Sequence, residues 1–193
     1  GFSLMMVMRW QLAYPDTVVP IVGSLIKWLA DLNGYASVGG TLPSDLYNVF
    51  GAMHGTIMIF LGVVPIIVGA FGNYIVPLQI GAPDMAFPKL NMASYWVYFI
   101  GGIVMLVSFF LPGGAANSGW TSYPPLSDIA TIGQTYWLIG MVFLITSSLL
   151  GSMNIIVTIV QLRAEGMTWM RLPFFVWSQL VTSFLLVLAF PPL

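Results

Sequence analysis

Few residues of this chain could carry out chemistry, because it contains 1 histidine and no cysteine. The histidine, His54, lies in a long stretch without charged residues, so we expect it at membrane depth. An ionisable group there is costly and normally faces the bundle interior, where it has a partner or a task. It is either a neutral histidine hydrogen-bonded to a neighbouring helix or an axial ligand of a heme iron. Gly51, Ala52 and Gly55 favour the ligand, because small residues leave room for a flat macrocycle, although they also serve ordinary helix packing.

A second group of polar residues lies in or beside apolar segments and comprises Asn73, Asp84, Asn91, Thr146, Ser147, Ser148 and Asn154. Asp84 follows Pro83, and in one interpretation it only caps a turn before the next helix. In the other interpretation it collects protons for a water-filled path, and the asparagines and serines orient the waters. Serine and asparagine are also common hydrogen-bonding residues between membrane helices, so both interpretations stay open.

Arg9 and Trp120 each have two interpretations as well. Trp120 precedes Tyr123 in a connection between apolar segments, and such aromatic residues commonly anchor a protein at the membrane surface. Arg9 either extends its cation to that surface or, when buried, offers hydrogen-bond donors to an oxygen of a bound ligand.

The composition indicates a membrane protein. Of the 193 residues, 59% are hydrophobic and only 6% are charged, whereas soluble domains carry about 25% charged residues. Five Lys and Arg against 6 Asp and Glu exclude a phosphate-binding surface, so we expect no nucleic-acid partner. One histidine without cysteine also excludes a zinc or copper site built by this chain alone.

The uncharged stretches predict an all-α, polytopic transmembrane helix bundle. A membrane-spanning helix needs roughly 20 apolar residues, and we predict such spans near 47–76, 92–111, 136–160 and 173–192. Residues 1–12 are too short for a full span. They are either an apolar or processed terminus or, as we expect, the end of a first membrane helix, which would make the chain a fragment of a longer one. The expected organisation is one partial domain over 1–193, with an outer connection at 13–45 and four membrane helices within 46–193.

The connections predict an orientation. Lys89 lies in the connection 77–91, and Arg163 and Arg171 lie in 161–172, so the positive-inside rule places both connections in the cytoplasm. Residues 17–32 carry apolar side chains at helical spacing, which predicts a short interfacial helix on the opposite side.

Several long motifs resemble subunit I of the heme-copper oxygen reductases, in their A-type cytochrome c oxidase branch. They are His54-Gly55-Thr56-Ile57-Met58-Ile59-Phe60, Phe71-Gly72-Asn73-Tyr74, Ile80-Gly81-Ala82-Pro83-Asp84-Met85-Ala86-Phe87-Pro88, Gly119-Trp120-Thr121-Ser122-Tyr123-Pro124-Pro125 and Leu150-Gly151-Ser152-Met153-Asn154. The match keeps the family's order and covers nearly the whole chain except an insert at about 13–44. The chain would then run from the end of the first helix through the fifth helix of a twelve-helix subunit.

The resemblance implies roles for single residues. His54 matches a ligand of the low-spin heme, of the heme a type, and Arg9 and Trp120 match residues that contact this heme. Asp84 matches the carboxylate at the mouth of the D proton pathway. The other residues that match this pathway are Asn73, Asn91, Ser147, Ser148 and Asn154.

The sequence departs from the family pattern at a few positions. Gln11 replaces a glutamate of a calcium or sodium site, so we do not predict that site. Leu4 and Leu46 stand where quinol-oxidising relatives carry Asp and His, which favours cytochrome c as the electron donor over quinol. The resemblance implies that the ligands of the high-spin heme and of copper lie outside this chain.

By this resemblance, the parent enzyme passes electrons from cytochrome c through the low-spin heme to a heme–copper centre, reduces oxygen to water and pumps protons. The fragment alone would be inactive. Expected partners are the rest of subunit I, a copper-bearing subunit II, subunit III, cytochrome c and the lipid bilayer, and the expected location is the bacterial inner membrane. The rival hypothesis is a cofactor-free, proton-coupled transporter or channel, in which His54 and Asp84 carry protons.

Overall fold

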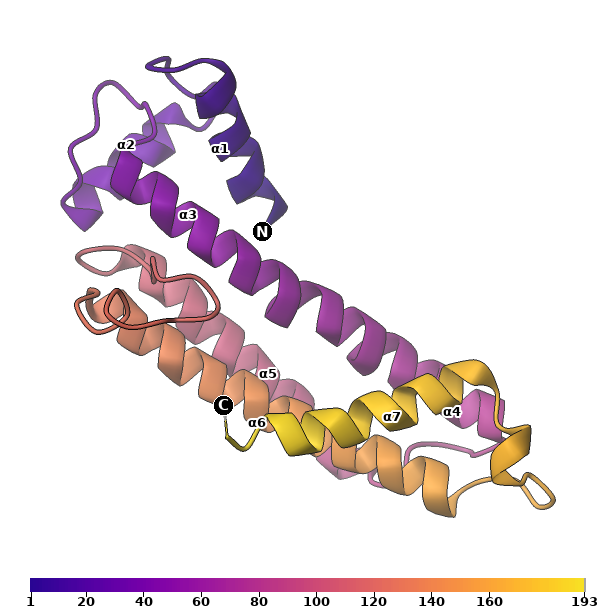
Figure 1. Ribbon diagram of the computed structural model, residues 1–193. Helices are drawn as coiled ribbons and strands as arrows, with labels where there is room; N and C mark the ends of the chain where they lie inside the picture. Colours follow the sequence, from indigo (N-terminus) through magenta and orange to yellow (C-terminus); the bar gives the residue numbers. More distant parts are fainter. Residues whose placement is uncertain (193) are drawn as a thin grey trace. The chain divides into compact units, whose positions relative to one another are not determined.

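The computed structural model describes residues 1–192, and all regular structure in that range is helical (Figure 1). This confirms the predicted all-α class. The α-helices are α1 (Phe2–Ala13), α2 (Gly23–Asn33), α3 (Ser44–Thr56), α4 (Asn73–Ile80), α5 (Pro88–Val107), α6 (Ile132–Gln161) and α7 (Phe174–Ala189). Shorter or wider helical turns are η1 (Ile57–Val63), η2 (Pro65–Gly72), η3 (Ser108–Phe110) and η4 (Trp169–Arg171).

Three helical runs are long and apolar enough to cross a membrane, and they confirm three of the predicted spans. They are Ser44–Ile80 with 37 residues, Pro88–Phe110 with 23 residues and Ile132–Gln161 with 30 residues. Each run begins a few residues before the predicted start, because polar residues or a proline outside the predicted span belong to the first helical turn.

The fourth predicted span, 173–192, is wrong in length. Its helix α7 has 16 residues, which rise about 24 Å, short of a hydrocarbon core of about 30 Å. Pro173 occupies the N-cap in an extended conformation, and the helix ends at Ala189, before Pro191. Prolines therefore limit the helix at both ends, although every residue between them is uncharged.

The first long run changes its winding between α3 and α4. Residues 57–63 and 65–72 form π-helical turns, which are wider than α-helical turns. Pro65 is the first residue of the second segment; its ring has no N–H group and clashes with the carbonyl of the preceding turn in a regular α-helix. The run ends at Gly81, whose φ of 77° lies in the left-handed region that favours glycine at a helix end.

The outer connection contains a helix, but that helix is shorter than the predicted 17–32. It begins only at Gly23, because Pro20 and Ile21 form a tight turn that the helix cannot include. The Val22 amide donates to the Pro20 carbonyl at 2.7 Å, and Ile21 has a φ of 69°, which is rare for a β-branched residue. Gly34 ends the helix with a φ of 78°.

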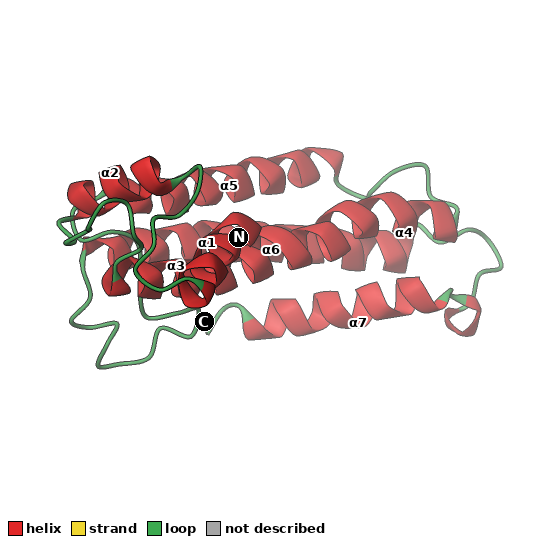
Figure 2. Ribbon diagram, turned by 90° about the horizontal axis from the view of Figure 1, so that it is seen from above, coloured by secondary structure: helices red, strands yellow, loops and turns green. Residues whose placement is uncertain are grey.

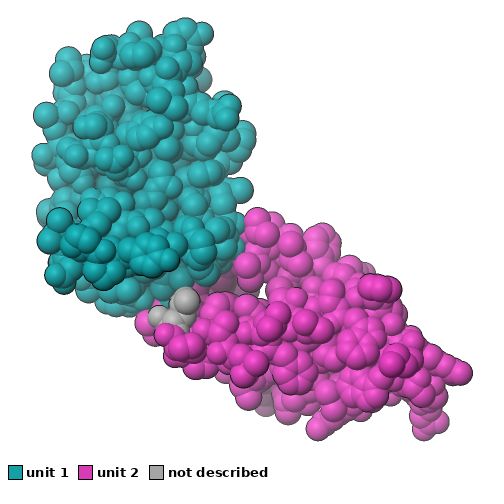
Figure 3. All heavy atoms as spheres, viewed as in Figure 1, with its two compact units in different colours: residues 1–62, 102–141 teal, residues 63–101, 142–193 magenta. Residues whose placement is uncertain are grey.

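The chain divides into two compact units (Figure 3). The first comprises residues 1–62 and 102–141, and its core includes Leu46, Val49, Phe50 and Met53 on one side of α3. The second comprises residues 63–101 and 142 onward. Its core joins α4, α6 and α7 through Val76, Ile80, Ile155, Ile159, Val176 and Leu180.

Candidate functional site

His54 lies near the end of α3 with its imidazole half-buried. Its Nδ1 atom donates a hydrogen bond to the Gly1 carbonyl oxygen at 2.9 Å. Because a carbonyl oxygen can only accept, Nδ1 carries a proton, and in the neutral imidazole the lone pair then lies on Nε2. This is the arrangement in which a histidine binds a metal, since a backbone carbonyl fixes the tautomer and orients the ring.

Small residues flank His54 on its helix. A Cβ atom added at Gly51 would lie 3.3 Å from the Met8 Cε atom, and one added at Gly55 would lie 3.9 Å from the Trp120 Cδ1 atom. The Trp120 ring is also 6.2 Å from the ring of Phe60. The structure thus brings Trp120, predicted from a distant connection, to the turn of α3 that carries His54.

A cavity of about 500 Å³ lies along α3 in the same unit, lined by Asn48, Gly51, Ala52, Asn117, Ser118, Gly119 and Leu126. The Oδ1 atom of Asn117 is buried and has no hydrogen-bond partner among the described residues. Buried polar atoms are normally paired, so this atom is available to a group that enters the cavity.

Arg9 lies on α1, which packs against α3. Its side chain is exposed, so the guanidinium is free to reach either the membrane surface or a ligand beside α3. Gln11, two residues further along α1, accepts a hydrogen bond from the Leu42 amide at 3.0 Å. Gln11 therefore ties α1 to the outer connection, a role that an amide oxygen fills without a bound cation.

The acidic and histidine side chains of residues 1–192 do not cluster. Within that range, no group of three or more His, Cys, Asp or Glu side chains could hold a metal ion. A metal bound by the described residues could therefore take only a single axial ligand from them. Such a ligand suits an iron whose other ligands come from a macrocycle.

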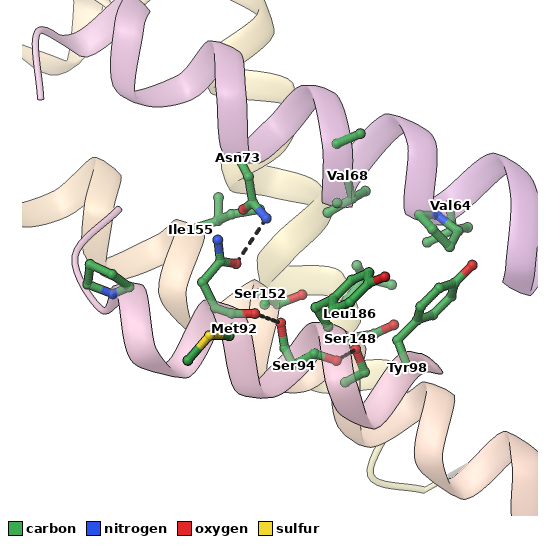
Figure 4. Close-up of a pocket in the computed structure, with 18 of the residues that line it drawn as sticks. Val64, Val68, Asn73, Met92, Ser94, Tyr98, Ser148, Ser152, Ile155 and Leu186 are labelled. Atoms are coloured by element: carbon green, nitrogen blue, oxygen red, sulfur yellow. Dashed lines mark hydrogen bonds between the residues drawn. The ribbon is translucent and has the colours of Figure 1, made fainter. Parts of the chain in front are cut away.

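The second unit contains a cavity of about 620 Å³ between η2, α5, α6 and α7 (Figure 4). Its polar lining residues are Asn73, Asp84, Asn91, Ser94, Tyr95, Tyr98, Ser147, Ser148 and Ser152. Five residues that the sequence analysis grouped for a proton path therefore line one cavity. The sequence analysis missed Ser94, Ser152 and the two tyrosines, although the i, i+3, i+4 and i+7 spacing of Asn91, Ser94, Tyr95 and Tyr98 places them on one face of α5.

Hydrogen bonds connect part of this lining. The Asn73 Nδ2 atom donates to the Asn91 Oδ1 atom at 2.9 Å, and the Ser94 hydroxyl donates to the Asn91 carbonyl at 2.8 Å. The Ser147 hydroxyl donates to the Ser94 carbonyl at 2.6 Å. The Ser152 hydroxyl is buried without a partner among the described residues. The lining therefore has a hydroxyl that can hydrogen-bond to water, and polar cavities of this kind commonly hold water.

Asp84 lies at the cavity in the segment between α4 and α5. Its carboxylate is exposed and accepts a hydrogen bond from the Met85 amide at 2.7 Å. Asp84 thus bonds the amide of the next residue and does not cap α5, which begins at Pro88, and it lines the cavity, as the other interpretation requires. The two roles are compatible, because a carboxylate has two oxygens and several lone pairs.

Asn154 has a different position from that expected. Its side chain is fully buried, is not part of the cavity lining, and clamps the backbone of Phe87. The Phe87 amide donates to Oδ1 at 2.9 Å, and Nδ2 donates to the Phe87 carbonyl at 3.2 Å. Thr158, which the sequence analysis missed, accepts from the Ala86 amide at 2.9 Å. Both residues therefore hold the segment that carries Asp84.

Thr146 does not join the polar residues of the cavity. Its hydroxyl is exposed and donates to the Val142 carbonyl of its own helix at 2.7 Å. A threonine satisfied in this way on a helix surface needs no polar neighbour.

Comparisons with known proteins identify the family of the chain. Residues 1–193 match the protein family described as "Cytochrome C and Quinol oxidase polypeptide I". The chain is 51% identical over 153 residues to cytochrome c oxidase subunit 1 of Thermostichus vulcanus, which is 79% of this chain and 27% of that protein. It is 47% identical over 155 residues to the probable cytochrome c oxidase subunit 1-alpha of Streptomyces avermitilis, with coverage of 79% and 27%. It is 47% identical over 153 residues to cytochrome c oxidase subunit 1 of Corynebacterium efficiens, with coverage of 78% and 26%. The chain thus spans about a quarter of the length of these relatives.

Proposed function

The chain belongs to the cytochrome c and quinol oxidase polypeptide I family of membrane proteins, and on this premise we propose that it is part of the catalytic subunit of a terminal respiratory oxidase. The whole enzyme would take electrons from cytochrome c, reduce oxygen to water and pump protons across the membrane. Family membership disfavours the cofactor-free transporter or channel.

We propose that His54 is an axial ligand of a low-spin heme. Two observations support this: the hydrogen bond between Nδ1 and the Gly1 carbonyl, which leaves the Nε2 lone pair of a neutral imidazole available, and the small residues that flank the histidine. The heme would supply a one-electron redox centre inside the membrane. Trp120, which lies beside Gly55, and Arg9, on the helix packed against α3, would contact the edge of the heme. Each offers N–H donors to negatively charged or oxygen-bearing substituents.

The rest of the active site belongs to other parts of the enzyme. Because the described residues hold one histidine and no metal-binding cluster, the ligands of the high-spin heme and copper would come from the remainder of subunit I. Further partners would be a copper-bearing subunit II and subunit III. Leu46 is fully buried and Leu4 is partly buried, so neither position offers the polar group of a quinol site, which favours cytochrome c as donor. We place the complex in the bacterial inner membrane.

We propose that the cavity of the second unit is the lower part of a proton path with Asp84 at its mouth. The single observation that carries this proposal is the convergence of Asp84, Asn73, Asn91, Ser147 and Ser148 on one cavity of about 620 Å³. Asp84 would collect protons from water. The asparagine and serine side chains would orient water molecules, along which protons move without a charged side chain at every step.

The test replaces Asp84 by asparagine in the whole oxidase. Because Asp84 is the only carboxylate in the described lining, we expect Asp84→Asn to slow proton uptake by about tenfold or more, as loss of a positioned proton-transfer group does. The heme spectrum should not change. Uptake is measured with a pH-sensitive dye during single turnovers.

A matched control is Glu165→Gln, which removes an exposed carboxylate on the same predicted side of the membrane but outside the cavity lining. This variant should take up protons at the normal rate. Normal uptake and pumping in Asp84→Asn would contradict the proposed path.

A further inference from the structure

The α2 helix has three different faces. Ile26 and Leu29 are buried in the first unit, whereas Leu25, Trp28 and Leu32 are 56%, 50% and 41% exposed. The exposed three stand at i, i+3 and i+7 and therefore share one side of the helix, which we call the apolar face of α2. Its large aliphatic and aromatic side chains are left uncovered by the described chain.

The third face of α2 is polar. Lys27 and Asp31 are exposed and stand at i and i+4, on the side of the helix away from the buried residues Ile26 and Leu29. A helix with a charged side and a separate exposed apolar side is typical of helices that lie in the plane of a membrane surface. The aromatic member, Trp28, is also the residue type that concentrates at that surface.

The packing of α2 sets its depth relative to the membrane. It lies beside the end of α5 and contacts η3, the last turn of the span Pro88–Phe110 (Figure 2). That span has 23 residues, which rise about 34 Å and slightly exceed a hydrocarbon core of about 30 Å. Phe110 therefore falls at the boundary between hydrocarbon and headgroups, and α2 falls beside it.

Two hydrogen bonds hold α2 at this depth. The Gly113 amide donates to the Asn33 carbonyl at 3.1 Å, at the last residue of α2. The Tyr35 hydroxyl donates to the Gly113 carbonyl. Since Gly113 lies three residues after the end of η3, the end of α2 is tied to the end of this span.

The apolar face of α2 continues the exposed surface of the span. Ile103, Leu106 and Val107 on α5 and Phe110 on η3 stand at i, i+3, i+4 and i+7 of this span, and all four are exposed. The Phe110 ring lies 6.1 Å from the Trp28 ring, so the two apolar surfaces meet. The exposed apolar surface along α5 and η3 thus continues onto α2.

We propose that the apolar face of α2 inserts into the headgroup–acyl boundary of the lipid bilayer. The insert at about 13–44 would then be a membrane-surface anchor beside α5, with Leu25, Trp28 and Leu32 in lipid and Lys27 and Asp31 in water. This proposal concerns the insert alone and does not depend on the proposed electron and proton transfer.

The test uses the whole oxidase in lipid vesicles, with single cysteines introduced against a background free of other reactive cysteines. Leu25→Cys and Leu32→Cys report on the apolar face, and Lys27→Cys on the same helix is the matched control. Each cysteine receives a nitroxide spin label. Collisions of the label with oxygen, which concentrates in lipid, and with a water-soluble nickel chelate are then compared. An unchanged heme spectrum verifies that each variant is folded.

We expect the oxygen-to-nickel collision ratio to be severalfold higher at positions 25 and 32 than at position 27. Strong nickel collisions at all three positions would overturn the proposal, because the face would then lie in water. Loss of collisions with both reagents at positions 25 and 32 would also overturn it, because another protein surface would then cover the face.

Discussion

At the residue scale, the imidazole of His54 is prepared for a ligand role by its one hydrogen bond. The Gly1 carbonyl holds the proton on Nδ1 and leaves the Nε2 lone pair available. Gly51 and Gly55 keep the helix face beside the imidazole narrow, which fits a flat macrocycle and also fits close packing of a neighbouring helix. The structure thus agrees with the sequence hypothesis of a heme ligand, which remains a prediction.

We expect His54→Ala in the whole oxidase to remove the low-spin heme component of the absorption spectrum, because no second histidine in this chain could replace the ligand. The high-spin component should remain if the protein folds. Optical spectra of the purified reduced enzyme measure both. The control Met58→Leu, an exposed position one turn along the same helical run, should leave both components intact. An unchanged low-spin signal in His54→Ala would show that the assignment is wrong.

At the element scale, α6 fixes the segment between α4 and α5. Asn154 and Thr158 stand one turn apart on α6, and together they hold the backbone of residues 86 and 87. This explains why a buried asparagine lies outside the cavity lining although the sequence grouped it with the cavity residues. Its task is to position the Asp84 segment, and only the folded chain shows which backbone groups it meets.

Asn154→Leu should loosen this segment. Removing the acceptor of the Phe87 amide costs about 1–3 kcal/mol, so the exchange of that amide with deuterium should accelerate by about tenfold or more. Hydrogen-exchange mass spectrometry of peptides covering residues 84–88 measures this effect. The control Thr146→Val removes a hydroxyl from the exposed side of the same helix and should leave the exchange unchanged. Equal exchange in both variants would contradict a positioning role for Asn154.

A second element-scale prediction concerns pH. Burial raises the pKa of the Tyr35 hydroxyl above its ordinary value of 10.0, and the nearby charge of Asp45 raises it further. A raised pKa means that the hydrogen bond to Gly113 is fully present below pH 10.0 and is lost as the pH rises through the elevated pKa. Tyrosinate absorbance should show Tyr35 titrating later than an exposed tyrosine, and Tyr35→Phe should abolish that late component.

At the scale of the whole molecule, the positions of the charged residues along the sequence predicted most of the membrane-spanning helices. Uncharged stretches predicted three spans correctly, because a charged residue is excluded from lipid wherever it occurs. The same reasoning failed for α7, because prolines rather than charges limit that helix. It also failed at Pro20 and Ile21, where backbone geometry delays the start of α2.

The candidate sites were predicted in part for a related reason. Polar residues in apolar helices stand out in a sequence, so Asp84, Asn73 and Asn91 were found before their cavity was known. The contact of Trp120 with the His54 turn joins positions far apart in the chain. Trp120 was found through its motif, whereas no spacing rule predicts this contact.

The cost of placing a charged side chain in the hydrocarbon core can be tested on one span. Phe99 lies at the midpoint of the span Pro88–Phe110 and is exposed. Phe99→Asp should disfavour membrane integration of this segment by about 3 kcal/mol, because the carboxylate would lie near the bilayer centre. Ile129→Asp makes the same change in the outer connection, where the residue is 76% exposed, and should integrate normally since the carboxylate stays in water. The fraction of chain integrated into microsomal membranes measures both. Equal integration of the two variants would mean that residue 99 does not lie within the hydrocarbon core, and the span would have to be placed elsewhere.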